Sequence, residues 1–257
     1  MTPWTQETEA ELVAVLRAAG CVFAEEEASL LLEQTPSRRA EMVARRVAGE
    51  PLEHVVGWVE LGGVRLRLDP GVFIPRQRTL LLIEAAQDLL QAEDAVLDLC
   101  CGSGAIGALL AGRIPGLTVT AADIDPIAVE NAAHNLAPHG GRAVVADLFD
   151  GVPPHLAGTL AVITANVPYI PTAELDFLPR DAREHEPVTT HDGGEDGLRV
   201  LALVAQQATG WLREGGSLLS ECSIGQIDAA LLLLERAGLT ARVQEDGETA
   251  VVIGTRA

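Results

Sequence analysis

Two glycines and an acid that follows them are the residues of this chain best placed to bind a charged ligand. Gly102 and Gly104 lie in a turn between the apolar run Ala95–Leu99, which has strand length, and a helical pattern over 105–111. Glycines let backbone N–H groups approach a ligand closely, and a helix start adds partial positive charge, so the turn suits a nucleotide or a carboxylate. Asp123 ends the next apolar run, roughly 20 residues on, where a carboxylate can accept hydrogen bonds from both hydroxyls of a ribose.

This turn has two chemical interpretations. Gly102, Gly104 and Gly107 match the G-x-G-x-x-G pattern of dinucleotide-binding dehydrogenases, a pattern that several classes of nucleotide-binding protein share. Asp98, however, belongs to the run D-L-C-C-G-S-G, which is typical of the first motif of methyltransferases. In addition, no second mononucleotide-binding half follows that could hold a nicotinamide. The pattern therefore favours S-adenosylmethionine as the cofactor.

The tetrapeptide Asn166-Val167-Pro168-Tyr169 carries the chemistry expected on the acceptor side. It follows the apolar run Leu160–Ala165 directly, and ligands of open α/β sheets bind at the carboxyl ends of strands, so it should face the same crevice as the glycine turn. The lone pair of an amide or aromatic amine nitrogen is delocalised. An asparagine Oδ1 and a neighbouring backbone carbonyl can accept its two N–H bonds and align it with a methyl group, while proline stiffens the turn and tyrosine covers the planar group.

The elements that position these residues alternate between strand and helix patterns. We expect a Rossmann-like α/β fold with a seven-stranded, mainly parallel sheet and helices on both faces, in which the close turn at Asp246-Gly247 makes the last strand antiparallel to its neighbour. A proline-rich segment, 166–195, interrupts the alternation and is predicted to be a long functional loop. The expected strands are 95–99, 117–123, 143–147, 160–165, 217–221, 240–245 and 249–255, and the expected helices are 79–90, 105–111, 126–136, 197–212 and 226–237.

The chain before residue 79 divides into two smaller parts. Residues 1–56 are predicted to form a small helical lobe, residues 57–78 a β-hairpin linker around a Gly-Gly turn, and residues 79–257 the donor-binding domain. In the lobe, Thr35 is the expected N-cap and Pro36 the first residue of a helix that stops at Gly49. The lobe is either a packing appendage or a docking surface for a partner.

Charge and composition exclude several classes of partner. The formal charge is −19, from 18 basic residues, all of them arginine, and 37 acidic ones. Such a chain repels a phosphate backbone unless a basic patch overrides the field, and one cluster of arginines is evident, at positions 38, 39, 45 and 46. Stable nucleic-acid binding is therefore not expected.

Cysteine and histidine usage predicts a cytoplasmic protein without a metal site. Cys21, Cys100, Cys101 and Cys222 have neither disulfide-framework nor zinc-site spacing. His185 and His191 are interpreted as a surface pair in a loop. No apolar run reaches membrane length, and the first residues are acidic where a signal peptide would be basic, so no membrane association is expected.

Seven ordered stretches together resemble one family over nearly the whole chain. They are similar to those of the HemK-type N5-glutamine methyltransferases of peptide chain release factors, which have the S-adenosylmethionine-dependent methyltransferase fold. The stretches are GEPLEHVVGWVELGGVRLRL, FIPRQRT, VLDLCCGSGAIG, ADIDPIAVENAAHN, NVPYIP, HEPVTTHDGGEDGL and GGSLLSECSIGQ.

The resemblance implies a role for each site residue. Cys100, Cys101, Gly102, Ser103 and Gly104 would hold the methionine end of S-adenosylmethionine. Asp123 would bind the ribose, and Asp147 with Leu148 the adenine. Asn166, with the carbonyl of Val167, would bind the acceptor amide next to the donor, with Pro168 and Tyr169 completing the catalytic tetrapeptide. The implied partner is a protein with an accessible glutamine, for which a release factor is the family's substrate.

Two departures from the family pattern keep alternatives open. Val167 stands where the family has the first proline of N-P-P-Y, which favours a paralogue, and Cys100-Cys101 replaces the usual Gly-Thr pair. A glycine at position 100 would be the freer residue, so the backbone there should be locally less permissive. The rival interpretations are an adenine-N6 nucleic-acid methyltransferase, which uses the same tetrapeptide chemistry, and a non-catalytic S-adenosylmethionine-binding protein.

Overall fold

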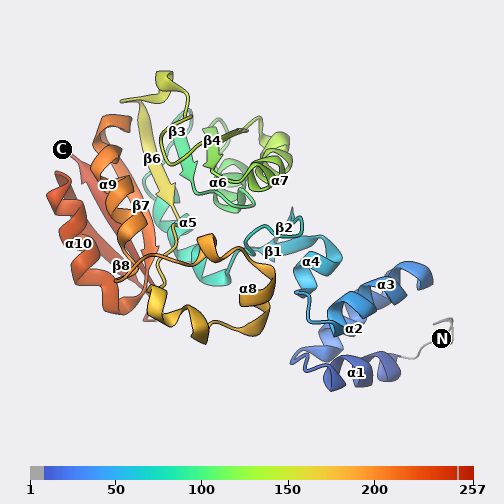
Figure 1. Ribbon diagram of the computed structural model, residues 1–257. Coiled ribbons are helices and arrows are strands. Elements are labelled where there is room, and N and C mark those ends of the chain that lie inside the picture. Colours follow the sequence, from blue (N-terminus) through green and yellow to red (C-terminus); the bar gives the residue numbers. More distant parts are fainter. Residues whose placement is uncertain (1–8, 248) are drawn as a thin grey trace.

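A twisted sheet forms the centre of the protein (Figure 1). The computed structural model describes residues 9–247 and 249–257. Within them the main sheet contains β3 (Ala95–Leu99), β4 (Thr118–Asp123), β5 (Arg142–Val145), β6 (Leu160–Ala165), β7 (Leu212–Cys222), β8 (Leu239–Glu245) and β9 (Ala250–Arg256). The spatial order is β5-β4-β3-β6-β7-β9-β8. β9 inserts between β7 and β8 and runs antiparallel to both, so the predicted seven-stranded sheet with an antiparallel last strand is confirmed.

Helices cover both faces of this sheet because successive strand residues point to opposite sides. Val96 belongs to a buried cluster with helices α5, α6 and α7, whereas Leu97 and Leu99 belong to a second cluster with α9 and α10. Helices α9 and α10 lie beside β7 and β8 in Figure 1. These helices are α5 (Leu80–Gln87), α6 (Ala105–Arg113), α7 (Pro126–Leu136), α9 (Arg199–Trp211) and α10 (Ile227–Arg236), and short 3-10 turns are η1 (Gln77–Thr79), η2 (Ala137–His139), η3 (Pro154–Leu156) and η6 (Ile224–Gln226).

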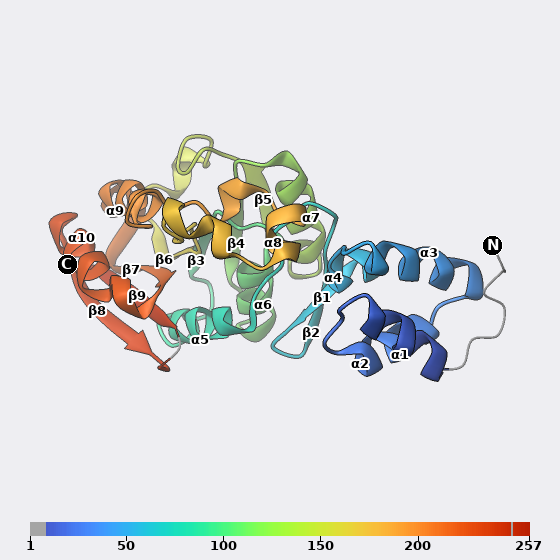
Figure 2. The same cartoon turned by 60° about the horizontal axis from the view of Figure 1, so that its bottom comes forward.

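The N-terminal lobe lies at one end of an elongated molecule, opposite α10 and β8 (Figure 2). Its helices enclose a separate apolar cluster that includes Leu12, Leu31 and Val43. Pro36 begins a helix as predicted, and Thr35 stands at its N-cap position, but the threonine side chain makes no capping hydrogen bond. The lobe contains α1 (Glu9–Ala18), α2 (Ala24–Leu32), α3 (Pro36–Val47) and α4 (Leu52–Val56), the last of which was not expected from the sequence.

Two of the four arginines in the cluster of the lobe pair with carboxylates, and a third donates to backbone carbonyl oxygens. Arg39 donates to the carbonyl oxygens at the end of α2, including that of Leu32 at 3.0 Å. Arg46 pairs with the buried Glu27 at 2.7 Å, and Arg45 pairs with Glu50. These contacts tie the helices of the lobe together, and the charges of Arg45 and Arg46 are balanced within it.

A two-stranded hairpin connects the lobe to the sheet domain. Its strands are β1 (Trp58–Leu61) and β2 (Val64–Arg67). Side-chain amides satisfy backbone groups along both of its edges. On β1, Gln77 Nε2 donates to the carbonyl oxygen of Glu60 at 2.7 Å.

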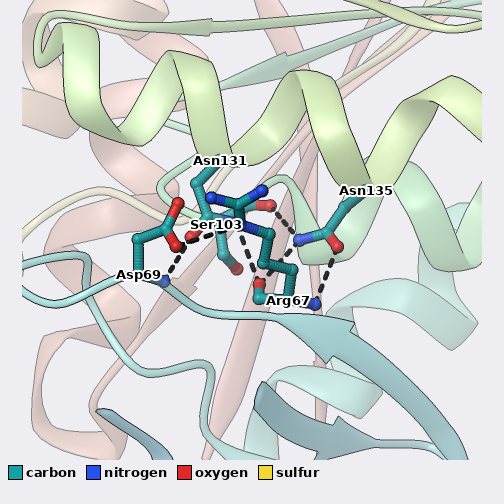
Figure 3. A network of polar contacts seen from close by, with 5 residues as sticks. All are labelled: Arg67, Asp69, Ser103, Asn131 and Asn135. Carbon is teal, nitrogen blue, oxygen red and sulfur yellow. Dashed lines mark hydrogen bonds and ion pairs between the residues drawn. The ribbon is translucent and has the colours of Figure 1, made fainter. Parts of the chain in front are cut away.

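Two asparagines of α7 hold the other edge, as Figure 3 shows. Asn135 accepts from the N–H of Arg67 and donates to its carbonyl oxygen, both at 2.9 Å. Asn131 accepts from the N–H of Asp69 at 2.7 Å. Asn135 also donates to the carbonyl oxygen of Ser103 at 2.9 Å, so the same helix anchors the hairpin and the glycine turn.

The segment 166–195 differs from the long loop predicted, because it contains short helices. They are η4 (Thr172–Phe177), α8 (Arg180–His185) and η5 (Val188–Thr190). The segment also closes on itself, since Ile170 N–H donates to the carbonyl oxygen of His191 and Gly193 N–H donates back to Ile170. A proline precedes each of these helices, and helices of three to six residues are too short to show helical periodicity in the sequence.

Strand β7 is longer than predicted, since it begins at Leu212, a residue expected to end the preceding helix. Leu212 pairs with Leu160, and the register then shifts before Ser217 pairs with Val162. No helix among the described residues is long and apolar enough to span a membrane.

Candidate active site

One cavity of about 580 Å³ lies at the carboxyl ends of the central strands, a volume typical of small-molecule sites. It brings together the two halves of the predicted site, which are the glycine turn with Asp123 and the tetrapeptide 166–169. More than forty residues separate Asp123 from Asn166 along the chain, and they meet because the carboxyl ends of parallel strands lie at one edge of the sheet. Gly104 does not line the cavity. The predicted residues that do are Cys100, Cys101, Gly102, Ser103, Asp123, Asp147, Leu148, Asn166, Val167, Pro168 and Tyr169.

The glycine turn is tightly curved. Gly102 and Gly104 have φ angles of 52° and 73°, and Cys100 shares this left-handed conformation with a φ of 55°. The backbone at Cys100 is therefore one that favours glycine, as expected, since residues other than glycine and asparagine rarely adopt this conformation. A Cβ on Gly104 would stand 2.8 Å from the Cβ of Ala132, so this glycine allows α7 to pack behind the turn.

A buried carboxyl group supports the turn from below. Asp98, which is fully buried in β3, accepts from Gly107 N–H and from the Thr164 hydroxyl, each at 3.0 Å. Burial raises the pKa of Asp98 to about 7, with a smaller contribution from the negative charge of Asp123. Asp98 thus ties the end of β3 to the first turn of α6.

Asp123 lies on the cavity wall beside the glycine turn. Its Oδ2 accepts from Gly102 N–H at 2.8 Å and its Oδ1 from Asp125 N–H at 3.0 Å. Burial raises the pKa of Asp123 despite these hydrogen bonds. Each carboxylate oxygen can accept more than one hydrogen bond, so both retain acceptor capacity toward a ligand.

The polar side chains of the glycine turn are suited to hydrogen-bonding a ligand and not to attacking it as nucleophiles. Among the residues the structure describes, the buried Ser103 Oγ lacks a hydrogen-bond partner, and Ser103 is one of the residues that line the same cavity. Burial raises the pKa of the Cys100 thiol to about 12 and also raises that of Cys101. Because the thiolate is the nucleophilic form, neither sulfur is activated for covalent catalysis.

The predicted adenine-binding pair lies at the far wall of the cavity. Asp147 and Asp150 exchange backbone hydrogen bonds of 2.9 Å and close a tight turn, in which Leu148 has a φ of 50°. Phe149 anchors this turn by stacking on Trp211 with ring centroids 5.3 Å apart. The turn thereby presents Leu148 to the cavity.

On the acceptor side, a buried glutamate that the sequence prediction did not include organises the tetrapeptide. Glu221, at the end of β7, accepts from the Tyr169 hydroxyl at 2.7 Å and from Arg78 Nε at 2.8 Å. It also accepts from the Thr79 hydroxyl at 3.0 Å, and Asn166 Nδ2 donates to that same hydroxyl at 3.3 Å. Arg78, Thr79 and Glu221 all line the cavity.

The remaining tetrapeptide residues are fixed through their backbone and through packing. The Val167 side chain is buried in the apolar cluster on the α9 and α10 side of the sheet. The packing therefore accommodates a valine where the family's N-P-P-Y motif has its first proline. Gln226 Nε2 donates to the carbonyl oxygen of Tyr169 at 2.8 Å and to that of Asp196 at 2.9 Å. This close approach requires Gly197, where a Cβ would lie 2.2 Å from the Tyr169 oxygen.

The interpretation of His185 and His191 as a surface pair is wrong. His191 is buried, with its Nε2 2.8 Å from Oε2 of Glu186 and its ring edge against Phe73. Glu186 is itself buried and accepts from Arg76 at 2.8 Å, while His185 is half-buried. The segment 166–195 therefore places the side chain of Glu186 inside the protein, where Arg76 and the N–H of Ile74 donate hydrogen bonds to it.

Comparison with known proteins identifies the family. A model of the methyltransferase small domain matches residues 63–176. The release factor glutamine methyltransferase of Geobacter sulfurreducens is 37% identical over 199 residues, which cover 77% of this chain and 69% of that protein. The chain belongs to the release factor glutamine methyltransferase family. Another member, from Bradyrhizobium diazoefficiens, is 35% identical over 217 residues, covering 82% of this chain and 73% of its own length.

Solved structures of methyltransferases share the fold of this family member. A methyltransferase from Pyrococcus furiosus aligns with a TM-score of 0.57 at 16% identity, covering 86% of this chain and 99% of that one. The 16S rRNA N2 G1207 methyltransferase of T. thermophilus, solved with AdoMet and guanosine, aligns with a TM-score of 0.57 at 21% identity, covering 78% and 50%. These likenesses confirm the predicted methyltransferase fold.

Proposed function

We propose that this protein transfers a methyl group from S-adenosylmethionine to the side-chain nitrogen of a glutamine in a peptide chain release factor. The observation that carries the proposal is the single cavity that contains both the glycine turn with Asp123 and the amide of Asn166, in a chain of this family. The glutamine methyltransferases of Geobacter and Bradyrhizobium named above support the choice of acceptor.

The proposed roles follow the positions of the side chains on the cavity wall. The glycine turn and the unpartnered Ser103 hydroxyl would hold the amino-acid end of the donor, Asp123 the ribose, and Leu148 the adenine. When bound, the donor supplies an electrophilic methyl group on a sulfonium. Donor-side residues then serve to bind and orient, as expected where both cysteines are neutral thiols.

Asn166 and Val167 would activate and align the acceptor nitrogen. The Asn166 Oδ1 and the Val167 carbonyl accept its two N–H bonds, which increases electron density on nitrogen as the new bond forms. The nitrogen would attack the methyl carbon in line, so that the new C–N bond would form as the bond from that carbon to the donor sulfur breaks and S-adenosylhomocysteine leaves. The nitrogen would then release one proton to water. Tyr169, held by Glu221, packs beside the planar amide.

A protein acceptor also agrees with the charge of the molecule. The net charge is −19, and two arginines of the lobe, Arg45 and Arg46, are engaged in internal ion pairs. We therefore propose that the acceptor is not a nucleic acid. Four cysteines without disulfide bonds suit a reducing compartment, so we place the reaction in the cytoplasm.

Mass spectrometry of the acceptor tests the proposal. Purified release factor is incubated with enzyme and S-adenosylmethionine and digested with trypsin, and a mass increment of one methylene on a single glutamine is expected. In parallel, tritiated donor is offered with release factor, with DNA and with RNA. Label in nucleic acid but not in protein would overturn the acceptor assignment, and no label in any of them, despite donor binding, would favour a non-catalytic protein.

A further inference from the structure

The carboxylate of Glu221 meets three side chains of the acceptor site at once. Its side chain is 1% exposed, and its partners come from two segments: Arg78 and Thr79 from η1, and Tyr169 from the tetrapeptide. A carboxylate is an acceptor only. Every hydroxyl that bonds to it must therefore donate its proton to it.

This requirement sets the direction of the hydrogen bonds as far as Asn166. Thr79 has one hydroxyl proton, which is used in the 3.0 Å bond to Glu221 Oε2, so toward Asn166 its oxygen can only accept. The group of Asn166 that faces Thr79 must then be the Nδ2 amino group, as observed at 3.3 Å. The amide oxygen of Asn166 is consequently turned away from Thr79 and left to accept from another donor.

We propose that Glu221 and Thr79 form a positioning relay that fixes the side-chain amide of Asn166 with its oxygen toward the acceptor nitrogen. The inference rests on the proposed function, in which Asn166 Oδ1 accepts from that nitrogen. Glu221 orients Tyr169 in the same way, by a direct bond to its hydroxyl. If the amide of Asn166 turned by half a rotation, it would present N–H groups to the N–H groups of the substrate.

Three substitutions separate this relay from a purely structural role. Thr79→Val keeps the shape but removes the hydroxyl, Thr79→Ser restores the hydroxyl, and Glu221→Gln keeps the size but adds a donor. Thr79→Val and Glu221→Gln should each lower kcat about 10- to 100-fold, with donor Kd within about twofold of the original. Thr79→Ser should recover most of the lost turnover, and Thr120→Val, in the buried part of β4, controls for loss of a buried threonine hydroxyl.

Non-additivity gives the sharper test, because both residues act through one hydrogen-bond chain. The double variant of Thr79→Val with Glu221→Gln should be no slower than the slower single variant. Losses that multiply, full turnover in Thr79→Val, or a donor Kd that weakens in step with kcat would each overturn the relay. If Glu221→Gln does not fold, Thr79→Val with its serine rescue still decides the question.

A spectroscopic measurement tests the relay without an acceptor. In ¹⁵N-labelled protein, the Asn166 side-chain amide signal, assigned by its loss in Asn166→Ala, should show slowed proton exchange that disappears in Thr79→Val. Slow exchange without methylation of a release factor would refute the proposed function and leave the relay intact. Unchanged exchange in Thr79→Val, together with normal methylation by the original enzyme, would refute the relay alone.

Discussion

Replacing Asp98 by asparagine should change how the stability of the protein depends on pH. Asp98 is fully buried and accepts one hydrogen bond from Gly107 N–H and one from Thr164. An asparagine can keep both contacts, since its oxygen accepts from the N–H and its amino group donates to the threonine hydroxyl. The substitution therefore removes the ionisation of this side chain while preserving its packing.

The magnitude follows from the raised pKa of Asp98. In the folded protein it is about 7, against 3.8 for an ordinary aspartate, so between these values the folded chain keeps a proton that the unfolded chain has lost. The stability contributed by the protonated form is full below the lower value and is lost as the pH rises through the upper one. The whole shift corresponds to about 4 kcal/mol, of which about 2 kcal/mol falls between about pH 5.5 and about pH 8.

Urea unfolding followed by tryptophan fluorescence measures this effect. The free energy of unfolding of Asp98→Asn, minus that of the original chain, should increase by about 2 kcal/mol from about pH 5.5 to about pH 8. Asp88→Asn, at an exposed position after α5, controls for the loss of one carboxyl group. A difference that stays constant with pH, or one that shrinks, would refute the reasoning.

Three further substitutions test the cavity itself. Asn166→Ala should lower turnover on the order of 100-fold with little change in donor affinity, measured by initial rates alongside calorimetry, and near-normal turnover would remove the acceptor role. Asp123→Ala should weaken S-adenosylmethionine by about 2 to 3 kcal/mol in calorimetry, and tight NADH binding in place of the methyl donor would contradict the cofactor assignment. Cys100→Val should lower the free energy of unfolding by about 2 kcal/mol, because a β-branched side chain fits a φ of 55° poorly, whereas Cys100→Gly should be close to neutral; equal effects would argue against strain there.

The parts of the site that follow strands could be predicted from the sequence. Gly102, Asp123 and Asn166 each come directly after an apolar run, and in a parallel sheet the carboxyl ends of such runs meet at one edge. That rule needs no knowledge of strand order. The family's glycine at the position of Cys100 also indicated a less permissive backbone there, whereas the left-handed φ of 55° is known from the structure.

The contacts of the residues that the sequence prediction missed depend on which segments are neighbours in the fold. Glu221 also ends a strand, so the edge rule could have included it, but its partnership with Thr79 and Tyr169 requires β7 to lie beside β6. Sheet order is set by long-range packing, which a single sequence does not display. His191 was misjudged because its buried partner Glu186 is held by Arg76, which lies 110 residues before Glu186 in the chain.

The hairpin between the lobe and the sheet domain is an unusually dependent structure. Isolated two-stranded hairpins are at best marginally stable in water, and this one has its outer backbone groups bonded to Gln77, Asn131 and Asn135 rather than to further strands. These amides come from η1 and α7, outside the two strands, so the conformation of the hairpin depends on both elements. Because the hairpin connects the lobe to the sheet domain, the contacts of η1 and α7 with it also help to set the direction in which the lobe projects.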